Sequence, residues 1–275
     1  RSQARSSNQI ESVDDLPITK AVINEDGTSQ DLDIVKLRLI IDEACSGVDD
    51  VSSEAVFDLI DKNIYDGIKK EDLSSSILIS IRPLIEKDPN YSYVVARLLL
   101  SSLYEEGLTF LNFKDNSPTI KEMSKSYPEY FKAYITKAVE LELIDKELLN
   151  YDMDLIAKNI NPSKDLAFTY LGLQTLYDRY FIHEQGKRFE LPQAFFMRVA
   201  MGLAINEENR EERTIEFYNL ISSFDFMCST PTLFNSGTLR PQLSSCYLST
   251  LPDDLKGIFE GISDDAMLSK FAGGL

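Results

Sequence analysis

A turn-rich segment near the end of the chain holds the residues best suited to chemistry. Residues 229–238 read STPTLFNSGT, and residues 240–246 read RPQLSSC. Short hydroxyl side chains and a glycine allow the backbone to approach a ligand closely and to offer O–H and N–H donors to phosphate or ribose oxygens. A polar loop before a strand would have the same composition, and a free cysteine such as Cys246 is most often a small buried hydrophobe. The residues alone therefore leave both interpretations open.

Cysteine and histidine usage narrows the possible chemistry. The three cysteines, Cys45, Cys228 and Cys246, are too few and too far apart for a disulfide framework, and no CxxC pair indicates a zinc site. We therefore predict no metal site and expect Cys45 to lie in a core. The single histidine, His183, follows two aromatic residues, where packing or surface exposure explains it. A cysteine hydrolase that uses Cys246 with His183 is disfavoured because no orienting residue stands out.

The overall charge argues against one class of partner. The 275 residues include 45 acidic and 28 basic residues, which give a formal net charge of −17. Such a chain repels a phosphate backbone, so we expect no nucleic-acid partner. No apolar run approaches the roughly 20 residues needed to cross a bilayer, and the chain does not open with a signal segment. The sequence predicts a cytoplasmic protein without membrane contact.

The first part of the chain is expected to form one compact unit over residues 17–107, after a flexible lead-in over residues 1–16. Strands over 18–23 and 29–34 would join around Asp26-Gly27, a dipeptide typical of a tight hairpin. Apolar spacing and capping residues then predict four helices. These helices are expected over 37 to about 46, 53 to about 63, 71–85 and 90–106.

The second part, residues 108–227, is expected to be mainly helical, and the texture changes at Cys228. Residues 243–250 resemble a buried strand and residues 253–271 a helix, which suggests the opening of an α/β domain over 228–275. A start without methionine and an end at a glycine pair lead us to expect a piece of a longer protein. The helices of the second part are expected over 128–142, 152–160, 165–180, 192–206 and 207–223.

Longer motifs link these segments to a known family. The run PTLFNSGTLRPQLSSCYL, followed by Asp253-Asp254, Leu268-Ser269-Lys270 and Ala272-Gly273-Gly274, resembles the large catalytic subunit of class I ribonucleotide reductases. Upstream, Asp26-Gly27, YDGI at 65–68 and YVVARL at 93–98 resemble the ATP cone of that family. The resemblance implies an ATP-cone domain with a small β-hairpin, a helical domain, and the first strand and helix of a ten-stranded α/β barrel.

The resemblance also implies roles for individual residues. Cys246 would be one of two cysteines that reduce the ribose and end as a disulfide, with its partner outside this chain. Thr230, Ser245, Gly273 and Gly274 would hold the substrate. The segments that carry Asp253, Asp254 and Lys270 would form the specificity site for a nucleotide effector, although an acidic pair before a helix is also a common N-terminal cap.

The implied partners follow from the same resemblance. Substrates would be ribonucleoside diphosphates, and ATP and deoxynucleoside triphosphates would be allosteric effectors. A small metal-containing subunit would generate the radical, so no cofactor is expected in this chain. A thioredoxin- or glutaredoxin-type reductant and a homodimer of large subunits are further expected partners. The alternative is a non-catalytic module that serves nucleotide regulation or assembly.

The cone segment departs from the family pattern where a triphosphate would bind. A Lys-Arg pair usually precedes the hairpin Asp-Gly, but Asn24 and Glu25 stand here. Loss of cations weakens the attraction for phosphates, so we expect weak or lost nucleotide binding. Among the other positions that usually contact nucleotide, Lys36 is retained, whereas the residues present at the remaining four are Lys70, Ser74, Ser101 and Glu105.

Overall fold

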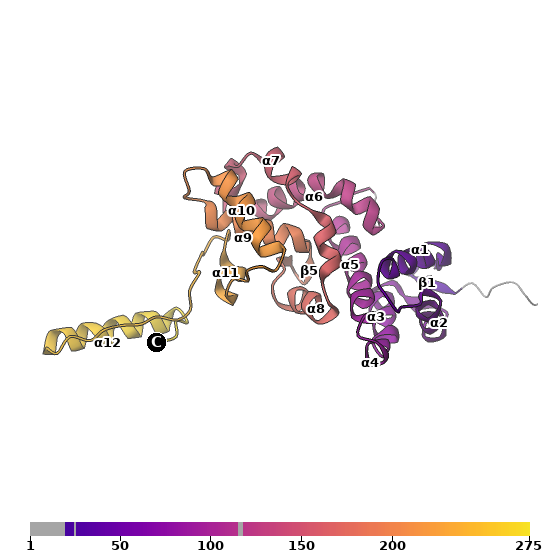
Figure 1. Ribbon diagram of the computed structural model, residues 1–275, viewed down its shortest axis with the longest axis horizontal. Helices are drawn as coiled ribbons and strands as arrows, with labels where there is room; N and C mark the ends of the chain where they lie inside the picture. Colours follow the sequence, from indigo (N-terminus) through magenta and orange to yellow (C-terminus); the bar gives the residue numbers. More distant parts are fainter. Residues whose placement is uncertain (1–19, 25, 115–117) are drawn as a thin grey trace, which may run out of the picture.

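The protein is elongated, with three regions following one another along its longest axis (Figure 1). The computed structural model describes residues 20–24, 26–114 and 118–275, so the expected lead-in over residues 1–16 lies outside the described residues. The N-terminal unit lies at one end, a helical body occupies the middle, and the last helix projects at the other end. None of the described helices combines the length and apolarity needed to span a membrane.

A three-stranded sheet opens the N-terminal unit. Strands β1 (Ala21–Ile23) and β2 (Ser29–Asp31) pair antiparallel, which confirms the expected hairpin. Strand β3 (Ile68–Lys69) pairs parallel with β1 on its other side and was not predicted. The Asp66 carboxylate accepts a hydrogen bond from the Ala21 N–H at 2.7 Å and so fixes the turn before β3. A two-residue strand offers no alternation of apolar residues, which explains why the sequence pattern did not indicate it.

Four short helices pack on this sheet: α1 (Ile34–Cys45), α2 (Ser53–Asn63), α3 (Lys70–Ile81) and α4 (Leu84–Lys87). Helix α1 begins earlier than expected because the Asp33 side chain accepts the Lys36 N–H and caps it, so Ile34 is helical rather than part of β2. The expected helix 71–85 is interrupted at Arg82 and Pro83. The four helices and helix α5 (Tyr91–Phe110) together enclose the N-terminal core. This core includes Val22, Leu37, Ile41, Val56, Ile60, Val94 and Leu98.

Helix α5 (Tyr91–Phe110) joins the N-terminal unit to the helical body. Val94, Val95 and Leu98 belong to the N-terminal core, whereas Leu99 and Leu103 belong to the central core. The helix ends four residues later than expected. It continues through Gly107, which packs against Leu191, so this glycine does not end the helix; a Cβ there would make an ordinary van der Waals contact with the Leu191 side chain at 3.4 Å. One rigid element therefore serves both cores.

Among the described residues, the helical body contains four helices of ten or more residues besides α5, the first of which is α6 (Ile120–Glu140), and several short elements around the central core. Helix α6 begins eight residues before the expected start because Thr119 and Glu122 form a capping box, and Pro128 lies inside it. The hairpin of β4 and β5 was not predicted. After α6, the elements are η1 (Lys146–Asn150), α7 (Met153–Lys158), η2 (Pro162–Ala167), α8 (Tyr170–Arg179), β4 (His183–Glu184), β5 (Lys187–Arg188), α9 (Pro192–Ala204) and α10 (Arg210–Ser222).

Helix α9 lies at the centre of this body. Every residue from Pro192 to Met201 is buried, as expected for a helix enclosed on all sides. Pro192 occupies the first turn as predicted, where a missing N–H costs nothing. Helix α10 packs along α9, while α6 and the segment before α9 cover other sides of the central core. The mainly helical fold with small sheets agrees with the cone and helical parts of the expected fold class, and the barrel part stays a prediction.

The last region is less regular than expected. Residues 230–235 form a short helix, α11 (Thr230–Asn235), where the sequence suggested a loop. Residues 243–250 form no strand; the backbone makes a single parallel bridge, between Cys246 and Gly274, and Leu248 is fully exposed. A strand needs neighbouring strands, and the described residues offer this segment only the end of the chain. Helix α12 (Leu255–Lys270) follows as predicted and projects from the body (Figure 1).

Candidate functional site

A cavity of about 300 Å³ opens between the small sheet and the helices of the N-terminal unit. It lies between β2, the start of α1, α3 and α5, and Pro118 closes one side. The positions at which a family cone usually contacts nucleotide come together here, because five of them line the cavity: Lys36, Lys70, Ser74, Ser101 and Glu105. The positions selected by resemblance to the family therefore line one cavity of the structure. We refer to it as the N-terminal cavity.

The charges of the N-terminal cavity do not favour a polyanion. Three acidic side chains and two lysines line it, and the carboxylate of Glu105 lies 3.3 Å from the Lys70 ammonium group. Lys70 is therefore already paired with a partner that repels phosphate. The Asp33 carboxylate is also engaged, because it accepts the Lys36 N–H and caps α1. A triphosphate entering this cavity would meet Lys36 as its one unpaired cation among the described lining residues.

The hairpin adds no positive charge to the cavity at the position where the family has one. The Asn24 amide donates a hydrogen bond to the Thr28 hydroxyl at 3.0 Å, so the side chain closes its own turn. Glu25 lies outside the described residues. Ser101 donates to the Arg97 carbonyl within α5 at 3.1 Å. Neutral groups engaged in local hydrogen bonds thus occupy two positions, 24 and 101, that resemble the family's nucleotide-contacting positions.

A second candidate site forms where the end of the chain meets the segment around Cys246. The Gly274 N–H donates to the Ser245 carbonyl at 2.5 Å, and the Tyr247 N–H donates to the Gly274 carbonyl at 2.9 Å. The Ser245 hydroxyl lies 3.8 Å from the Cys246 sulfur. Three residues predicted for substrate and redox chemistry are therefore neighbours. Cys246 is exposed, as a thiol that exchanges with an external disulfide must be.

Gly273 and Gly274 are required by close packing. A Cβ at Gly273 would lie 2.9 Å from the Tyr247 ring and 3.0 Å from the Leu268 carbonyl. A Cβ at Gly274 would lie 3.2 Å from the Ser245 carbonyl. Both contacts are tighter than side chains normally make. The glycine pair lets residues 273–274 lie beside Cys246, and its role in a substrate turn stays a prediction.

Thr230 begins α11, and its hydroxyl lies 3.1 Å from the Tyr180 hydroxyl. Helix α11 is tied to the Cys246 segment, because the Thr232 hydroxyl donates to the Leu243 carbonyl at 3.0 Å and the Asn235 amide donates to the Gln242 carbonyl at 2.8 Å. We call residues 230–238 the α11 turn. Thr230 and Cys246 are thus carried by two connected segments.

The three residues predicted for effector specificity are not brought together in one chain. Asp254 caps α12 by accepting the Gly257 N–H at 2.9 Å, so the cap interpretation holds. Asp253 precedes it and is exposed. Lys270 ends the same helix, and its ammonium group lies 5.6 Å from the centre of the Phe271 ring. Sixteen helical residues separate the two ends by about 24 Å.

The remaining thiols and the histidine lie away from these sites. Burial raises the pKa of the Cys45 thiol to about 11, with the Asp42 carboxylate adding to the effect. Burial also raises the pKa of Cys228. Both thiols are half-buried and stay protonated at neutral pH, whereas His183 is exposed on β4. Within the described ranges, no group of three or more His, Cys, Asp or Glu side chains has a metal-binding arrangement.

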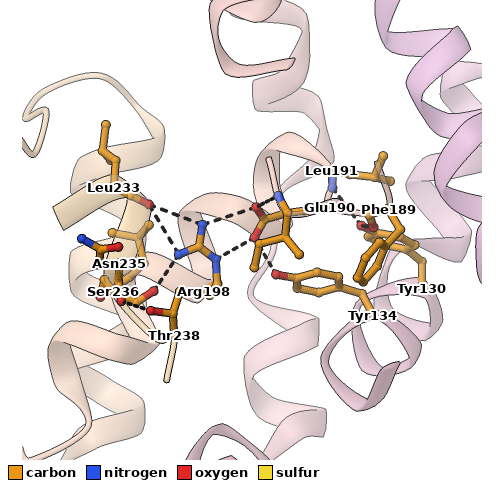
Figure 2. A network of polar contacts seen from close by, with 12 residues as sticks. Tyr130, Tyr134, Phe189, Glu190, Leu191, Arg198, Leu233, Asn235, Ser236 and Thr238 are labelled. Carbon is orange, nitrogen blue, oxygen red and sulfur yellow. Dashed lines mark hydrogen bonds and ion pairs between the residues drawn. The ribbon is translucent and has the colours of Figure 1, made fainter. Parts of the chain in front are cut away.

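A buried ion pair beneath the α11 turn was missed by the sequence analysis (Figure 2). The guanidinium of Arg198 and the carboxylate of Glu190 are fully buried, with Nε and Oε1 2.7 Å apart. Arg198 also donates to two carbonyls of the α11 turn, those of Leu233 and Ser236. An arginine inside the apolar run FFMRVAM was the available signal, because a charge there must find a partner.

Comparison with known families assigns the two main parts of this chain. Residues 20–106, which include the N-terminal cavity, match the ATP cone domain. Residues 166–241, which run from η2 through α9 to the α11 turn, match the all-alpha domain of ribonucleotide reductase. The chain therefore combines a segment that matches the ATP cone with a segment that matches the all-alpha domain of ribonucleotide reductase. This pairing confirms the class of protein indicated by the motifs.

Three similar proteins are named as the alpha subunit or the large chain of ribonucleoside-diphosphate reductase. The chain is 43% identical over 259 residues to the ribonucleoside-diphosphate reductase subunit alpha of Chlamydia muridarum, which covers 94% of this chain and 24% of the relative. It is 34% identical over 257 residues to the subunit of the same name from Helicobacter pylori strain 26695, which covers 92% of this chain and 31% of the relative. The large chain from Schizosaccharomyces pombe is 30% identical over 259 residues, with shares of 92% and 30%.

These comparisons confirm the recognition made from the motifs. The chain is a relative of the large, or alpha, subunits of ribonucleoside-diphosphate reductases, and it spans about a quarter to a third of the length of the curated relatives it matches. An assembly module without a link to an enzyme is not favoured, since each of these relatives is named as a reductase subunit.

Proposed function

We propose that this chain is the N-terminal part of the large subunit of an enzyme that reduces ribonucleoside diphosphates to deoxyribonucleoside diphosphates. The observation that carries the proposal is identity of 34–43% over 92–94% of the chain with two reductase alpha subunits. Residues 17–107 are the cone, residues 108–227 the helical domain, and residues 228–275 the start of a ten-stranded α/β barrel. A cytoplasmic location fits this role.

The proposed chemistry of Cys246 is a two-electron oxidation. Its thiol and that of a second cysteine outside this chain lose two protons and two electrons and form an S–S bond. The ribose C–O bond breaks, a C–H bond forms in its place, and the hydroxyl leaves as water. A thioredoxin- or glutaredoxin-type dithiol then reduces the disulfide by exchange. The exposed Cys246 sulfur suits this exchange. A separate metal-containing small subunit would supply the radical.

The substrate would be held by short polar groups around this thiol. Thr230 and Ser245 offer hydroxyl donors to the diphosphate and ribose oxygens, and the glycine pair leaves room for the sugar. Hydroxyls suit this role because they donate without crowding the reacting carbon atoms. The connection between α11 and the Cys246 segment supports a shared substrate site.

Regulation would use a specificity site at α12 and not the N-terminal cavity. Asp253, Asp254 and Lys270 would bind a deoxynucleoside triphosphate or ATP. Because α12 separates Asp254 from Lys270, one effector can meet both only if a second large subunit aligns its own α12 alongside. Exposed apolar residues on α12 support such a homodimer; they are Leu255, Ile258, Phe259 and Ile262.

The test is reduction of a ribonucleoside diphosphate by the full-length subunit combined with its small subunit and a dithiol reductant. We expect a deoxyribonucleoside diphosphate to accumulate over many turnovers. Absence of product with an active small subunit would contradict the proposal and favour a regulatory or assembly module.

A further inference from the structure

We propose that Arg198, held by Glu190, is a positioning residue that sets the geometry of the α11 turn for the substrate's diphosphate; the inference rests on the function proposed above. The buried Arg198–Glu190 ion pair has no direct part in the proposed reaction. Figure 2 shows the pair between helix α6 on one side and the α11 turn on the other.

The carboxylate side of the pair is fixed from several directions. Glu190 accepts hydrogen bonds from the Tyr134 hydroxyl at 2.5 Å and from the Ile182 N–H at 2.9 Å. Arg198 donates to both of its oxygens, from Nε at 2.7 Å and from Nη2 at 3.3 Å. Each carboxylate oxygen thus accepts two donors, so Glu190 cannot rotate without losing hydrogen bonds in a region without solvent.

The other side of the guanidinium holds the end of α11. Nη1 donates to the Ser236 carbonyl at 2.6 Å, and Nη1 and Nη2 both lie 3.4 Å from the Leu233 carbonyl. Carbonyls at the end of a helix have no partner within it, and a cation is favoured there. The rigid fork of arginine therefore joins the Glu190 carboxylate to the end of a six-residue helix that begins with Thr230.

Two further contacts press the α11 turn against α9. The Ser236 hydroxyl donates to the Val199 carbonyl at 2.7 Å. A Cβ at Gly202 would collide with the backbone of Gly237, which itself has a φ of 77° and lies over the Arg198 stem. Leu233 is the only buried hydrophobic side chain of the turn. Polar bonds of fixed direction therefore add to the apolar contacts of the turn, which are Leu233 in the central core and the Phe234 ring stacked on Tyr180 at 4.4 Å between centroids.

This construction suits a binding turn better than a stability device. A buried ion pair adds little stability compared with apolar side chains of similar volume, because both charges lose their hydration. Its specific consequence is a fixed position for the atoms it bonds. The position of the α11 turn in turn sets the Thr230 hydroxyl, which also meets Tyr180. A shift of about 1 Å in such a group is costly for binding or rate.

The experiment measures KM and kcat for a ribonucleoside diphosphate in the full-length subunit with its small subunit, without effector. In Arg198→Lys the charge stays to balance Glu190, but one ammonium group cannot bridge both sides. We expect KM to rise about tenfold and kcat to change less than about twofold. Ser236→Ala, which leaves the ion pair intact, should raise KM about threefold.

Arg97→Lys is the matched control. Arg97 is also buried and donates to helix-terminal carbonyls, those of Ala44 and Ser46 at the end of α1, but it lies in the N-terminal core. We expect its KM to equal that of the parent. Thr230→Val marks the effect of removing a direct substrate contact. Amide hydrogen exchange should also quicken over residues 230–238 in Arg198→Lys and not in Arg97→Lys.

The outcomes separate the two proposals. If the parent subunit makes no deoxynucleotide, the proposed function fails and this inference falls with it. If Thr230→Val raises KM while Arg198→Lys and Ser236→Ala leave KM unchanged, the function stands and the positioning role is wrong. The positioning role is also wrong if Arg198→Lys lowers kcat and thermal stability without changing KM. If Arg198→Lys does not fold, Ser236→Ala decides.

Discussion

Exposure separates Cys246 from the other two thiols of the chain. Burial keeps Cys45 and Cys228 protonated, whereas Cys246 is exposed between Ser245 and Gly274. Thiol–disulfide exchange requires that the attacking sulfur reach its target, and the redox role of Cys246 is a proposal that rests on the motif. The exposure of Cys246 is consistent with that proposal.

We predict that Cys246→Ser in the full-length subunit abolishes multiple turnover with a dithiol reductant, because a serine cannot form the disulfide. Substrate affinity should stay within about threefold, since the thiol is a reagent and not an anchor. Steady-state product formation and substrate binding measure the two effects. Cys228→Ser is the control and should keep turnover. A Cys246→Ser enzyme that cycles at the parent rate would remove this residue from the mechanism.

A buried carboxyl group in the central core gives the fold a pH dependence. Asp165 is fully buried and accepts hydrogen bonds from Tyr104 at 3.0 Å and from the Gln193 amide at 2.8 Å. Burial raises the pKa of Asp165 to about 7, against 3.8 for an ordinary aspartate. The folded chain therefore holds a proton that the unfolded chain releases between these pH values. Its contribution to stability falls as the pH rises from about 4 to about 7.

We predict that Asp165→Asn weakens this pH dependence, because an amide does not titrate. Between pH 5 and pH 8 the free energy of unfolding of the parent should lose roughly 2–3 kcal/mol more than that of the variant. Urea unfolding of the chain at both pH values measures the difference. Asp152→Asn is the control, since this exposed cap residue is replaced by an equally good cap. Parallel pH profiles for parent and Asp165→Asn would show that Asp165 is ionised in the fold.

Helices with strong local signals were predictable, and the exceptions have physical causes. The sequence predicted a helix that starts at Pro128. The capping box at Thr119 begins α6 earlier, and the helix accommodates the proline. Gly107 suggested a helix end, but it packs against Leu191, a partner 84 positions away that no local pattern reveals. Contacts between distant segments overrode local preference in both cases.

In the candidate sites, too, local motifs were predictable and contacts between distant segments were not. Motifs located the residues around the N-terminal cavity and placed Ser245, Cys246 and Gly274 close together. Pairing across space was not predictable: the Lys70–Glu105 ion pair joins α3 to α5, and the Arg198–Glu190 pair joins α9 to the segment before it. Side-chain partners depend on the packing of whole helices, which a single sequence does not display.

Helix α12 allows the cap and the effector roles of Asp254 to be separated. We predict that Asp254→Ala together with Lys270→Ala lowers the effector-dependent preference among substrates by about fivefold or more, while the unstimulated rate changes less than about twofold. Specificity is a coupling between sites, so weaker effector contacts reduce it without altering the chemistry. Relative reduction of competing diphosphates, with and without effector, measures this in the full-length enzyme.

Asp254→Asn identifies the cause of that effect. Asparagine caps a helix as well as aspartate but carries no charge. A preference lost in both single variants at position 254 would indicate a charged effector contact, and one lost only in Asp254→Ala would indicate the cap. Asp264→Asn, at an exposed position within α12, is the control. An unchanged preference in the double variant would mean that the specificity site lies elsewhere.

At the scale of the whole molecule, the N-terminal cavity and the Cys246 segment lie in regions at opposite ends (Figure 1). Helix α5 spans the distance between the cores, with Glu105 in the cavity and Glu106 bound to the Arg188 N–H of β5 at 2.7 Å. Because α5 is shared, an isolated cone that ends near residue 106 would lose the last turn of this helix and expose part of the central core. Nucleotide binding is therefore best measured on the whole chain.

We predict that the N-terminal cavity binds ATP and dATP with a dissociation constant no tighter than about 1 mM, measured in a parent chain that carries Asp254→Ala and Lys270→Ala to remove the proposed specificity site. Each lost charge-assisted hydrogen bond is worth about 1.5–3 kcal/mol, so two losses reduce a micromolar affinity, about 8.2 kcal/mol, to the millimolar range. Asn24 and Glu25 supply no cation, and Glu105 neutralises Lys70. Glu105→Gln combined with Asn24→Lys and Glu25→Arg should tighten binding at least about tenfold.

Calorimetric titration of the parent and the variants checks this prediction. Glu54→Gln is the matched control: Glu54 pairs with Arg38 at 3.3 Å on the exposed side of the same unit and does not line the cavity. It removes the same single negative charge as Glu105→Gln alone, so a gain seen in Glu105→Gln and not in Glu54→Gln reflects local contacts and not the reduced net charge of the chain. Micromolar binding by the parent would mean that the cavity holds nucleotide through groups other than the lysines, and that the acidic lining does not exclude a triphosphate.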